Sequence, residues 1–242
     1  SPKAPLLTRQ MKAAGYATGH FGKWHLGAGE GAPLPSAYGV DQSATTVSNE
    51  SNLRDPAAPP EAHRWGKSTG LIMDHALDFI RSHKDQPFSL NIWTLVPHAP
   101  LDPTPEQLAV YHDLKPDAAN PAFSPLTQKY YQQAKDLRSQ MQVFAASITD
   151  LDHQVGRLLD VLKELGIDDN TLIVYSSDNG PEDYHIGNAS NGGVGSPGPL
   201  RGRKRSIYEG GVRTPLIVRW PGKVEGGVFD ETTVMGGVDL LP

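Results

Sequence analysis

Polar side chains at the ends of the predicted strands have residue types that suit chemistry on a small oxyanion. Lys23 and His25 follow the first predicted strand, His98 follows the second, and Lys204 lies in a basic loop before the fourth. Lysines act as point charges for a tetrahedral oxyanion, and histidines near neutral pH can pass a proton to a leaving oxygen. Because ligands bind outside the carboxyl ends of strands in open α/β sheets, these side chains are predicted to share one pocket.

An aspartate and an asparagine, Asp178 and Asn179, come directly after the third predicted strand. Their oxygens are hard ligands suited to Ca²⁺ or Mg²⁺, although Asp-Asn-Gly after a strand is also common turn chemistry. Likewise, Lys23 and His25 alone are typical of a solvated loop. A divalent cation combined with lysines and histidines fits hydrolysis of a sulfate or phosphate ester, with charge stabilised in the transition state.

The elements that must position these residues alternate between helix and strand, which predicts an α/β fold with a mainly parallel central sheet flanked by helices. The clearest helix has apolar residues in steps of three and four from Met141 to Leu165, with Gly166 as its stop. Residues 40–66 are polar and are predicted to be irregular. The other helices are predicted at 6–15 and 69–83, and the strands at 16–21, 88–96, 171–176 and 216–220.

Composition narrows the classes of function. The net charge of −5 and pI near 6.0 argue against a nucleic-acid partner, and no apolar run approaches the 18 residues typical of a membrane span. The 25 glycines and 21 prolines indicate a loop-rich protein. The absence of cysteine excludes disulfides, thiolate metal sites and a cysteine nucleophile in the chain as it stands.

Several motifs together resemble those of one enzyme family. The run Gly15-Tyr16-Ala17-Thr18-Gly19-His20-Phe21-Gly22-Lys23-Trp24-His25-Leu26-Gly27 is similar to the second signature of the formylglycine-dependent (type I) sulfatases. This family belongs to the alkaline-phosphatase superfamily, which implies the α/β fold predicted above. Further similar segments are Asp150-Leu151-Asp152, Ser177-Asp178-Asn179-Gly180, Lys204 five residues before Glu209, Trp220-Pro221-Gly222 and Val238-Asp239-Leu240-Leu241-Pro242.

The resemblance implies a role for each matching residue. Lys23 would contact the sulfate and the nucleophile, and His25 would hold the formylglycine hydrate and help release sulfate. His98 and Lys204 would bind the ester and support departure of the alcohol. His185, in the loop after the aspartate motif, is a further candidate for substrate contact.

The resemblance also implies a cofactor, a substrate class and a location. Asp178 and Asn179 would be ligands of Ca²⁺, with Mg²⁺ as the alternative. The substrate would be a carbohydrate or aryl sulfate, and the location periplasmic or extracellular, or lysosomal in a eukaryote. Specificity would reside in the loops 28–66, 101–126 and 181–199.

Two parts of the family pattern are missing from the chain. The Cys-x-Pro-Ser-Arg segment that yields the nucleophile and an earlier Asp-Asp pair both precede the Gly-Tyr-x-Thr motif in the family, and neither is present here. We therefore expect residues 1–242 to form a single, incomplete sulfatase catalytic domain, truncated at both ends and inactive by itself.

Two other functions stay open at this point. One is a phosphonate monoester or phosphodiester hydrolase of the same superfamily, and the other is a non-catalytic sulfatase-like protein that binds an anion or a partner. Among neighbouring residues, Glu209 could orient Lys204 or be structural, and the latter is favoured. Arg203 and Arg205 could bind an anionic substrate, although solvation is the favoured expectation, and His20 is expected to be structural or at the surface.

Overall fold

The computed structural model describes residues 3–27, 30–47, 52–53, 64–65, 69–183 and 193–240. No helix in these ranges is long and apolar enough to cross a membrane. The α-helices are α1 (Leu7–Ala13), α2 (Thr69–Ser82), α3 (Pro105–Ala109), α4 (Pro125–Gln133), α5 (Leu137–Glu164) and α6 (Glu209–Val212). The strands are β1 (Ala17–Trp24), β2 (Gln42–Val47), β3 (Asn52–Leu53), β4 (Arg64–Trp65), β5 (Phe88–Trp93), β6 (Ile173–Ser176) and β7 (Leu216–Arg219).

The chain divides into two compact units. The first unit comprises Ser1–Leu95, Gln154–Thr171 and Trp220–Pro242, and the second comprises Val96–His153 and Leu172–Arg219. Short 3₁₀ helices add to the first unit at Pro35–Tyr38, Asp168–Asn170 and Gly237–Leu240.

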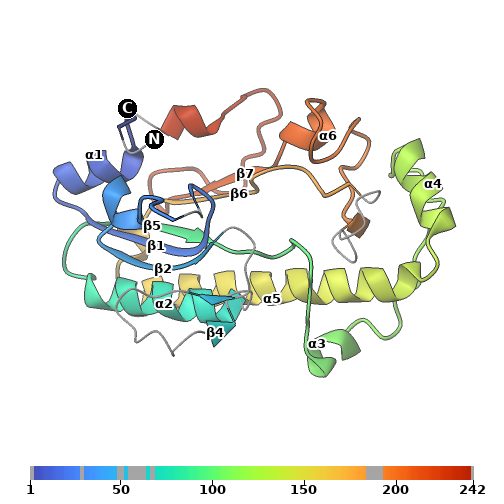
Figure 1. Ribbon diagram of the computed structural model, residues 1–242, viewed down its shortest axis with the longest axis horizontal. Coiled ribbons are helices and arrows are strands. Elements are labelled where there is room, and N and C mark those ends of the chain that lie inside the picture. Colours follow the sequence, from blue (N-terminus) through green and yellow to red (C-terminus); the bar gives the residue numbers. More distant parts are fainter. Residues whose placement is uncertain are drawn as a thin grey trace. The chain divides into compact units, whose positions relative to one another are not determined.

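A parallel sheet in the order β2–β1–β5 forms the centre of the first unit. Figure 1 shows α2 lying along one face of this sheet, and α1 also contacts β1. Five large apolar side chains of α2 are buried, and each contributes about 2 kcal/mol through burial. These side chains are Ile72, Met73, Leu77, Phe79 and Ile80.

The second unit is built from loops and short elements around the first part of α5. The proline-rich segment 97–125 is an ordered excursion that contains α3, and it is tied to α5 where Gln142 donates to the Tyr111 carbonyl at 2.7 Å. A buried Tyr131 on α4 donates to the Val194 carbonyl at 2.6 Å, and burial raises the pKa of this phenol to about 12. Strands β6 and β7 pair antiparallel.

The structure confirms most of the expected elements. The α/β class and the parallel sheet are as predicted, and Gly166 ends α5 with a positive φ of 68°. The prediction of an irregular segment over 40–66 was wrong for residues 42–47, which form β2, and for the short antiparallel pair of β3 and β4. Thr45 and Thr46 are buried in β2. Threonine is β-branched and fits a strand well, but its hydroxyl makes the segment look polar in the sequence, which is why the strand was not predicted.

Candidate active site

Lys23 and His25 lie at the carboxyl end of β1, as predicted. Lys23 pairs in register with Thr46 of β2, and Trp24 between the two residues is buried. Lys23 is half-buried and His25 is exposed, so the alternation of an extended chain places both on the side away from the Trp24 ring.

The backbone conformation just before Lys23 requires a glycine at position 22. Its φ is +106°, and a Cβ added there would lie 2.0 Å from the carbonyl oxygen of Trp93 on β5. No L-residue fits that position without moving the backbone. The glycine therefore fixes how β1 delivers Lys23 to the end of the sheet.

The side chain of His20 holds the backbone of Lys23 from within the core. His20 is 1% exposed, and its Nε2 lies 3.0 Å from the Lys23 carbonyl oxygen. The ring packs edge-on against Trp24 and Trp93, with centroids 5.0 and 4.8 Å away. Burial lowers the pKa of His20 to about 4 against the opposing effect of the Lys23 carbonyl. At neutral pH the imidazole is therefore uncharged and donates Nε2–H, which fits the expected structural role.

His98 lies in the second unit, two residues after Val96. Its Nδ1 is 2.7 Å from the carbonyl oxygen of Ala99. A carbonyl can only accept, so Nδ1 carries a proton and the ring orientation is fixed by its own neighbour. Such an imidazole presents Nε2 as the atom that can exchange a proton with a substrate oxygen.

Asp178 and Asn179 form a tight turn at the end of β6. Ser177 Oγ donates to the Asn179 carbonyl at 2.9 Å, and Asn179 Nδ2 donates to the Gly180 carbonyl at 2.8 Å. The Gly180 amide donates to the Gly211 carbonyl at 2.9 Å, and a Cβ at Gly180 would lie 1.9 Å from the Gly210 carbonyl oxygen. The turn is thereby pressed against α6.

The donor set of this turn fits part of a calcium site. Asp178 is exposed and supplies a carboxylate. Asn179 uses Nδ2 to donate a hydrogen bond to the Gly180 carbonyl, so its Oδ1 is the atom that could coordinate a cation. Calcium takes six to eight oxygen ligands, so two residues are an incomplete set. Within the described ranges, no group of three or more histidine, aspartate or glutamate side chains could hold a metal ion. Further ligands would have to come from other residues.

Lys204 lies on a loop joined to the one that holds Asp178 and Asn179. The Lys204 amide donates to the Pro181 carbonyl at 2.9 Å, and Nζ is 3.8 Å from Glu182 Oε2. Partial burial raises the pKa of Glu182, but hydrogen bonds from Arg205 and the charge of Lys204 outweigh it and hold the pKa below its usual range. Glu182 is thus an ionised partner of Lys204.

Glu182 is a residue that sequence reasoning missed. The sequence offered Glu209 as the group that could orient Lys204, but Glu209 lies 3.5 Å from Arg213 at the surface, which agrees with the favoured structural role. The Glu182 carboxylate instead accepts two hydrogen bonds of 3.2 Å from the Arg205 guanidinium. The sequence signal that could have identified Glu182 is its position directly after Pro181, close to the Asp178-Asn179 motif.

Arg203 has a different role from the one expected. It is 5% exposed, and it donates to the carbonyls of Glu182 at 2.9 Å, Gly193 at 2.8 Å and Gly195. The expectation that it is solvated was wrong, because three carbonyls from two loop segments enclose its guanidinium. Arg203 therefore holds the loops that carry Lys204.

The candidate residues fall into groups by location. Lys23 and His25 belong to the first unit, whereas the second unit holds His98, Asp178, Asn179 and Lys204. Within the second unit, hydrogen bonds join the Asp178–Asn179 turn to the Lys204 loop. His185 lies outside the described residues. The predicted meeting of all strand ends in one pocket stays a prediction.

Comparison with known proteins supports the resemblance seen in the motifs. A family model described as Sulfatase matches residues 2–240. Arylsulfatase A of Homo sapiens is 32% identical over 96% of this chain, which covers 45% of that protein. An N-acetylgalactosamine-6-O-sulfatase of Bacteroides thetaiotaomicron is 28% identical over 90% of this chain, which covers 52% of it. The chain thus spans about half the length of the curated relatives that it matches.

Solved structures show the fold. The structure of Ps i-CgsB in complex with k-i-k-neocarrahexaose aligns with a TM-score of 0.70 at 22% identity, covering 92% of this chain and 48% of that one. The phosphonate monoester hydrolase SpPMH from Silicibacter pomeroyi aligns with a TM-score of 0.50 at 20% identity, covering 92% of this chain and 54% of that one. Both likenesses confirm the predicted α/β class.

Proposed function

Because the chain belongs to the sulfatase family, we propose that it forms the central part of a sulfuric ester hydrolase that acts on a saccharide or aryl sulfate. The observation that carries the proposal is the hydrogen-bonded junction between the Asp178–Asn179 turn and the Lys204 loop. In the proposal, this junction connects the residues that would bind the cation, Asp178 and Asn179, to the lysine that would bind the sulfate, Lys204. The saccharide option draws on relatives such as the N-acetylgalactosamine-6-O-sulfatase.

In this proposal the chain supplies the groups that bind the ester and move protons. Lys23 and Lys204 place positive charge against the sulfate oxygens, where it stabilises the charge that develops in the transition state. His98 acts as a general acid in its imidazolium form: the Ala99 carbonyl holds the Nδ1 proton, and Nε2–H passes its proton to the alcohol oxygen as the ester bond breaks. His25 takes part in releasing sulfate from the nucleophile.

A calcium ion, with Mg²⁺ as the alternative, is the proposed cofactor, and Asp178 and Asn179 are its proposed ligands in this chain. When bound, such an ion polarises the sulfate and adds positive charge beside the nucleophile. The active protein should contain close to one calcium per chain by elemental analysis, and chelation should abolish turnover. Zinc in a near-stoichiometric amount would contradict this assignment.

The nucleophile is proposed to be a formylglycine supplied by a segment that precedes the Gly15–Gly27 motif in the family pattern. None of the 242 residues is a cysteine, and Ser1-Pro2 lacks an arginine at the family spacing. The isolated chain should therefore show no turnover of an aryl sulfate above background. Measurable turnover by these residues alone would overturn this part of the proposal.

The lysine roles are tested in the protein expressed from the whole gene. Lys204→Ala or Lys23→Ala should lower kcat/KM for an aryl sulfate by about 10² to 10⁴, because each removes a positive charge from the developing oxyanion. Lys223→Ala, which removes an exposed lysine, is the matched control and should leave kcat/KM unchanged. Equal effects of all three substitutions would refute the assignment.

Assays of the protein expressed from the whole gene also distinguish a sulfatase from the two alternative functions. A phosphonate monoester hydrolase would cleave an aryl phosphonate monoester faster than the aryl sulfate, whereas we expect the reverse order. A non-catalytic protein would cleave neither. The chain retains six polar residues that match the family pattern, which favours an enzyme: Lys23, His25, His98, Asp178, Asn179 and Lys204. Sulfatase activity in a periplasmic, secreted or lysosomal fraction would fit the location that we propose from family resemblance.

A further inference from the structure

A cavity of about 290 Å³ lies beside Lys204, entirely within the second unit. Arg201, Lys204 and Tyr208 line it, together with Leu126 and Asp183. This volume is at the lower end of small-molecule sites, which run from about 300 to 1,000 Å³.

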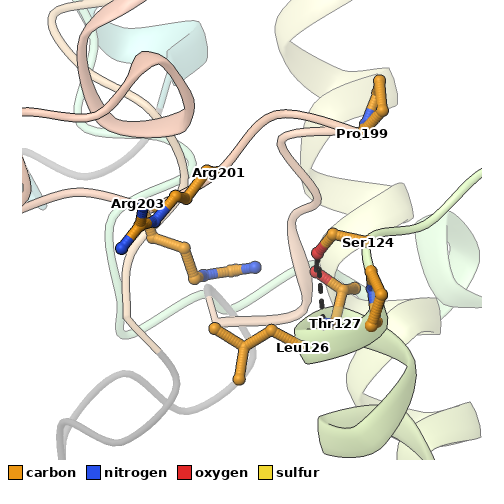
Figure 2. Close-up of a pocket in the computed structure, with 8 residues that line it drawn as sticks. Ser124, Leu126, Thr127, Pro199, Arg201 and Arg203 are labelled. Atoms are coloured by element: carbon orange, nitrogen blue, oxygen red, sulfur yellow. Dashed lines mark hydrogen bonds between the residues drawn. The ribbon is translucent and has the colours of Figure 1, made fainter.

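An adjoining cavity of about 350 Å³ shares some of these residues and extends to the start of α4. Figure 2 shows Arg201 and Arg203 on one side of it and Ser124, Leu126 and Thr127 on the other. The space next to Lys204 therefore continues past Arg201.

The cations around the cavity have different tasks. Arg203 is committed to three carbonyls and Arg205 to the carboxylate of Glu182, as described above. Arg201 instead stacks its guanidinium on the ring of Tyr208, with Cζ 3.8 Å from the ring centroid. Stacking of this kind orients a guanidinium and leaves its N–H donors, which point outward in the guanidinium plane, directed towards an anion.

The charge around the cavity exceeds what one sulfate ester can balance. Four cationic residues, at positions 201, 203, 204 and 205, line the cavity, and so does one acidic residue, Asp183. A second carboxylate, that of Glu182, pairs with Lys204 and Arg205. Two positive charges are left over, whereas a sulfate monoester carries a single negative charge. A ligand with a second anionic group would complement the remaining charge.

The cavity also has an apolar wall. Leu126 and Tyr208 both line it and are 52% and 45% exposed, so each presents apolar surface to a bound molecule. Ligand sites combine such surface with a few placed polar groups. A pyranose ring, with apolar C–H faces and polar edges, matches this combination.

We propose that Arg201 and Tyr208 form a subsite for a second anionic group, so that the substrate is a saccharide carrying a carboxylate or another sulfate near the scissile sulfate ester. This inference rests on the proposed function, in which Lys204 binds the scissile sulfate. Arg201 pairs with the second anion in a forked geometry, and the Tyr208 ring supports both the guanidinium and the sugar. The subsite makes this pair the specificity-determining residues of the chain.

The test is titration calorimetry of the 242-residue chain with three disaccharides. The first carries one sulfate, the second one sulfate and a uronic acid carboxylate, and the third two sulfates. At least one dianion should bind about tenfold more tightly than the monosulfated probe, and the tighter dianion identifies the second group. Arg201→Gln should remove this preference, whereas Arg213→Gln, which removes an exposed arginine outside the cavity, should keep it.

Two further variants keep the test decisive if Arg201→Gln does not fold. Arg201→Lys keeps the charge without the fork and should retain part of the preference, and Tyr208→Leu should weaken it while Tyr208→Phe does not. Equal affinity of the wild-type chain for all three probes, absence of binding, or equal effects of the Arg201 and Arg213 substitutions would overturn the subsite.

The outcome is independent of catalysis because binding needs no turnover. If the protein expressed from the whole gene hydrolyses no sulfate ester but the chain prefers a dianion through Arg201, the proposed function is contradicted and the subsite is supported. A protein that hydrolyses aryl sulfates but binds the three disaccharides equally would contradict only the subsite.

Discussion

The two lysines proposed to bind sulfate are held in opposite ways. Lys23 lies one residue before the end of β1, a central strand with a neighbour on each side, and its backbone is anchored by the buried ring of His20. Lys204 lies on a loop that is held by backbone hydrogen bonds and by the charges of Glu182 and Arg205. One position depends on apolar burial and the other on polar contacts.

The difference predicts different sensitivities. Apolar burial is non-directional and is barely changed by salt, so the Lys23 region should respond mainly to changes of volume and to protonation of the buried His20. Ion pairs near the surface are weak and screened by salt, so the Lys204 loop should respond mainly to charge. Both regions nevertheless depend on a glycine packed against a carbonyl, at Gly22 and at Gly180.

The largest expected effect is that of Gly22→Ala. The new Cβ would meet the Trp93 carbonyl at 2.0 Å in a paired strand, and φ is +106°, so strain and overpacking add. The free energy of unfolding should fall by at least about 4 kcal/mol, measured by urea denaturation. Gly15→Ala shares a positive φ but has no atom within 4 Å, and it should cost only about 1–2 kcal/mol. Equal losses for the two variants would show that the close approach is unimportant.

The next effect is the pH dependence that His20 gives to the first unit. Its pKa is about 4 in the folded protein against an ordinary value of 6.5, so the unfolded chain binds more protons between these values. Stability is therefore fully present above pH 6.5 and is lost as pH falls towards 4, by about 3 kcal/mol. Urea denaturation at pH 7 and about pH 4.5 measures the loss. His20→Gln keeps a donor but does not titrate, so its loss over this range should be smaller by that amount.

A smaller loss is expected from Gly180→Ala in the second unit. The Cβ would lie 1.9 Å from the Gly210 carbonyl, but the contact joins a turn to a short helix and the loops can separate. The cost should be about 2 kcal/mol, with increased proteolysis in the 177–211 region. Gly156→Ala in α5 meets no atom within 4 Å and should stabilise the chain by about 0.5–1 kcal/mol. A cost at Gly180 equal to that at Gly22 would remove the distinction between sheet and loop.

The contrast also explains what the sequence could reveal. Periodic burial predicted α2 and the long part of α5 well, because a helix face that packs on a core leaves apolar residues in steps of three and four. Strand β2 was not predicted, because its buried threonines look polar in the sequence. The strand-end positions of Lys23 and Asp178 followed from local patterns alone.

The polar contacts of the second unit could not be predicted in the same way. Which carboxylate meets Lys204 depends on how the 177–183 and 201–211 loops fold together, and Glu182 is more distant in sequence than Glu209. The burial of Arg203 likewise needs carbonyls from Glu182, Gly193 and Gly195 at once. Contacts assembled from several loops leave no periodic signal in the sequence.

The smallest expected effect, and the sharpest test of the charge-held loop, is that of Glu182→Gln. The substitution keeps the side-chain size but removes the charge that faces Lys204 and Arg205. Stability at pH 7 and low salt should fall by about 1 kcal/mol, because the pairs are only partly buried. The pKa of Glu182 is lowered on folding, so this contribution is present above the usual glutamate pKa and is lost as pH falls below it.

The difference between wild type and Glu182→Gln should therefore shrink at about pH 3 and in roughly 1 M salt, measured by urea denaturation under each condition. Glu231→Gln, which removes an exposed carboxylate in the other unit, is the control and should change stability by less than about 0.5 kcal/mol. A Glu182 effect that is unchanged by salt and pH would mean that the loop is held by packing, as the Lys23 strand is. Lys204 would then be positioned in the same manner as Lys23, and the contrast between the two lysines would fail.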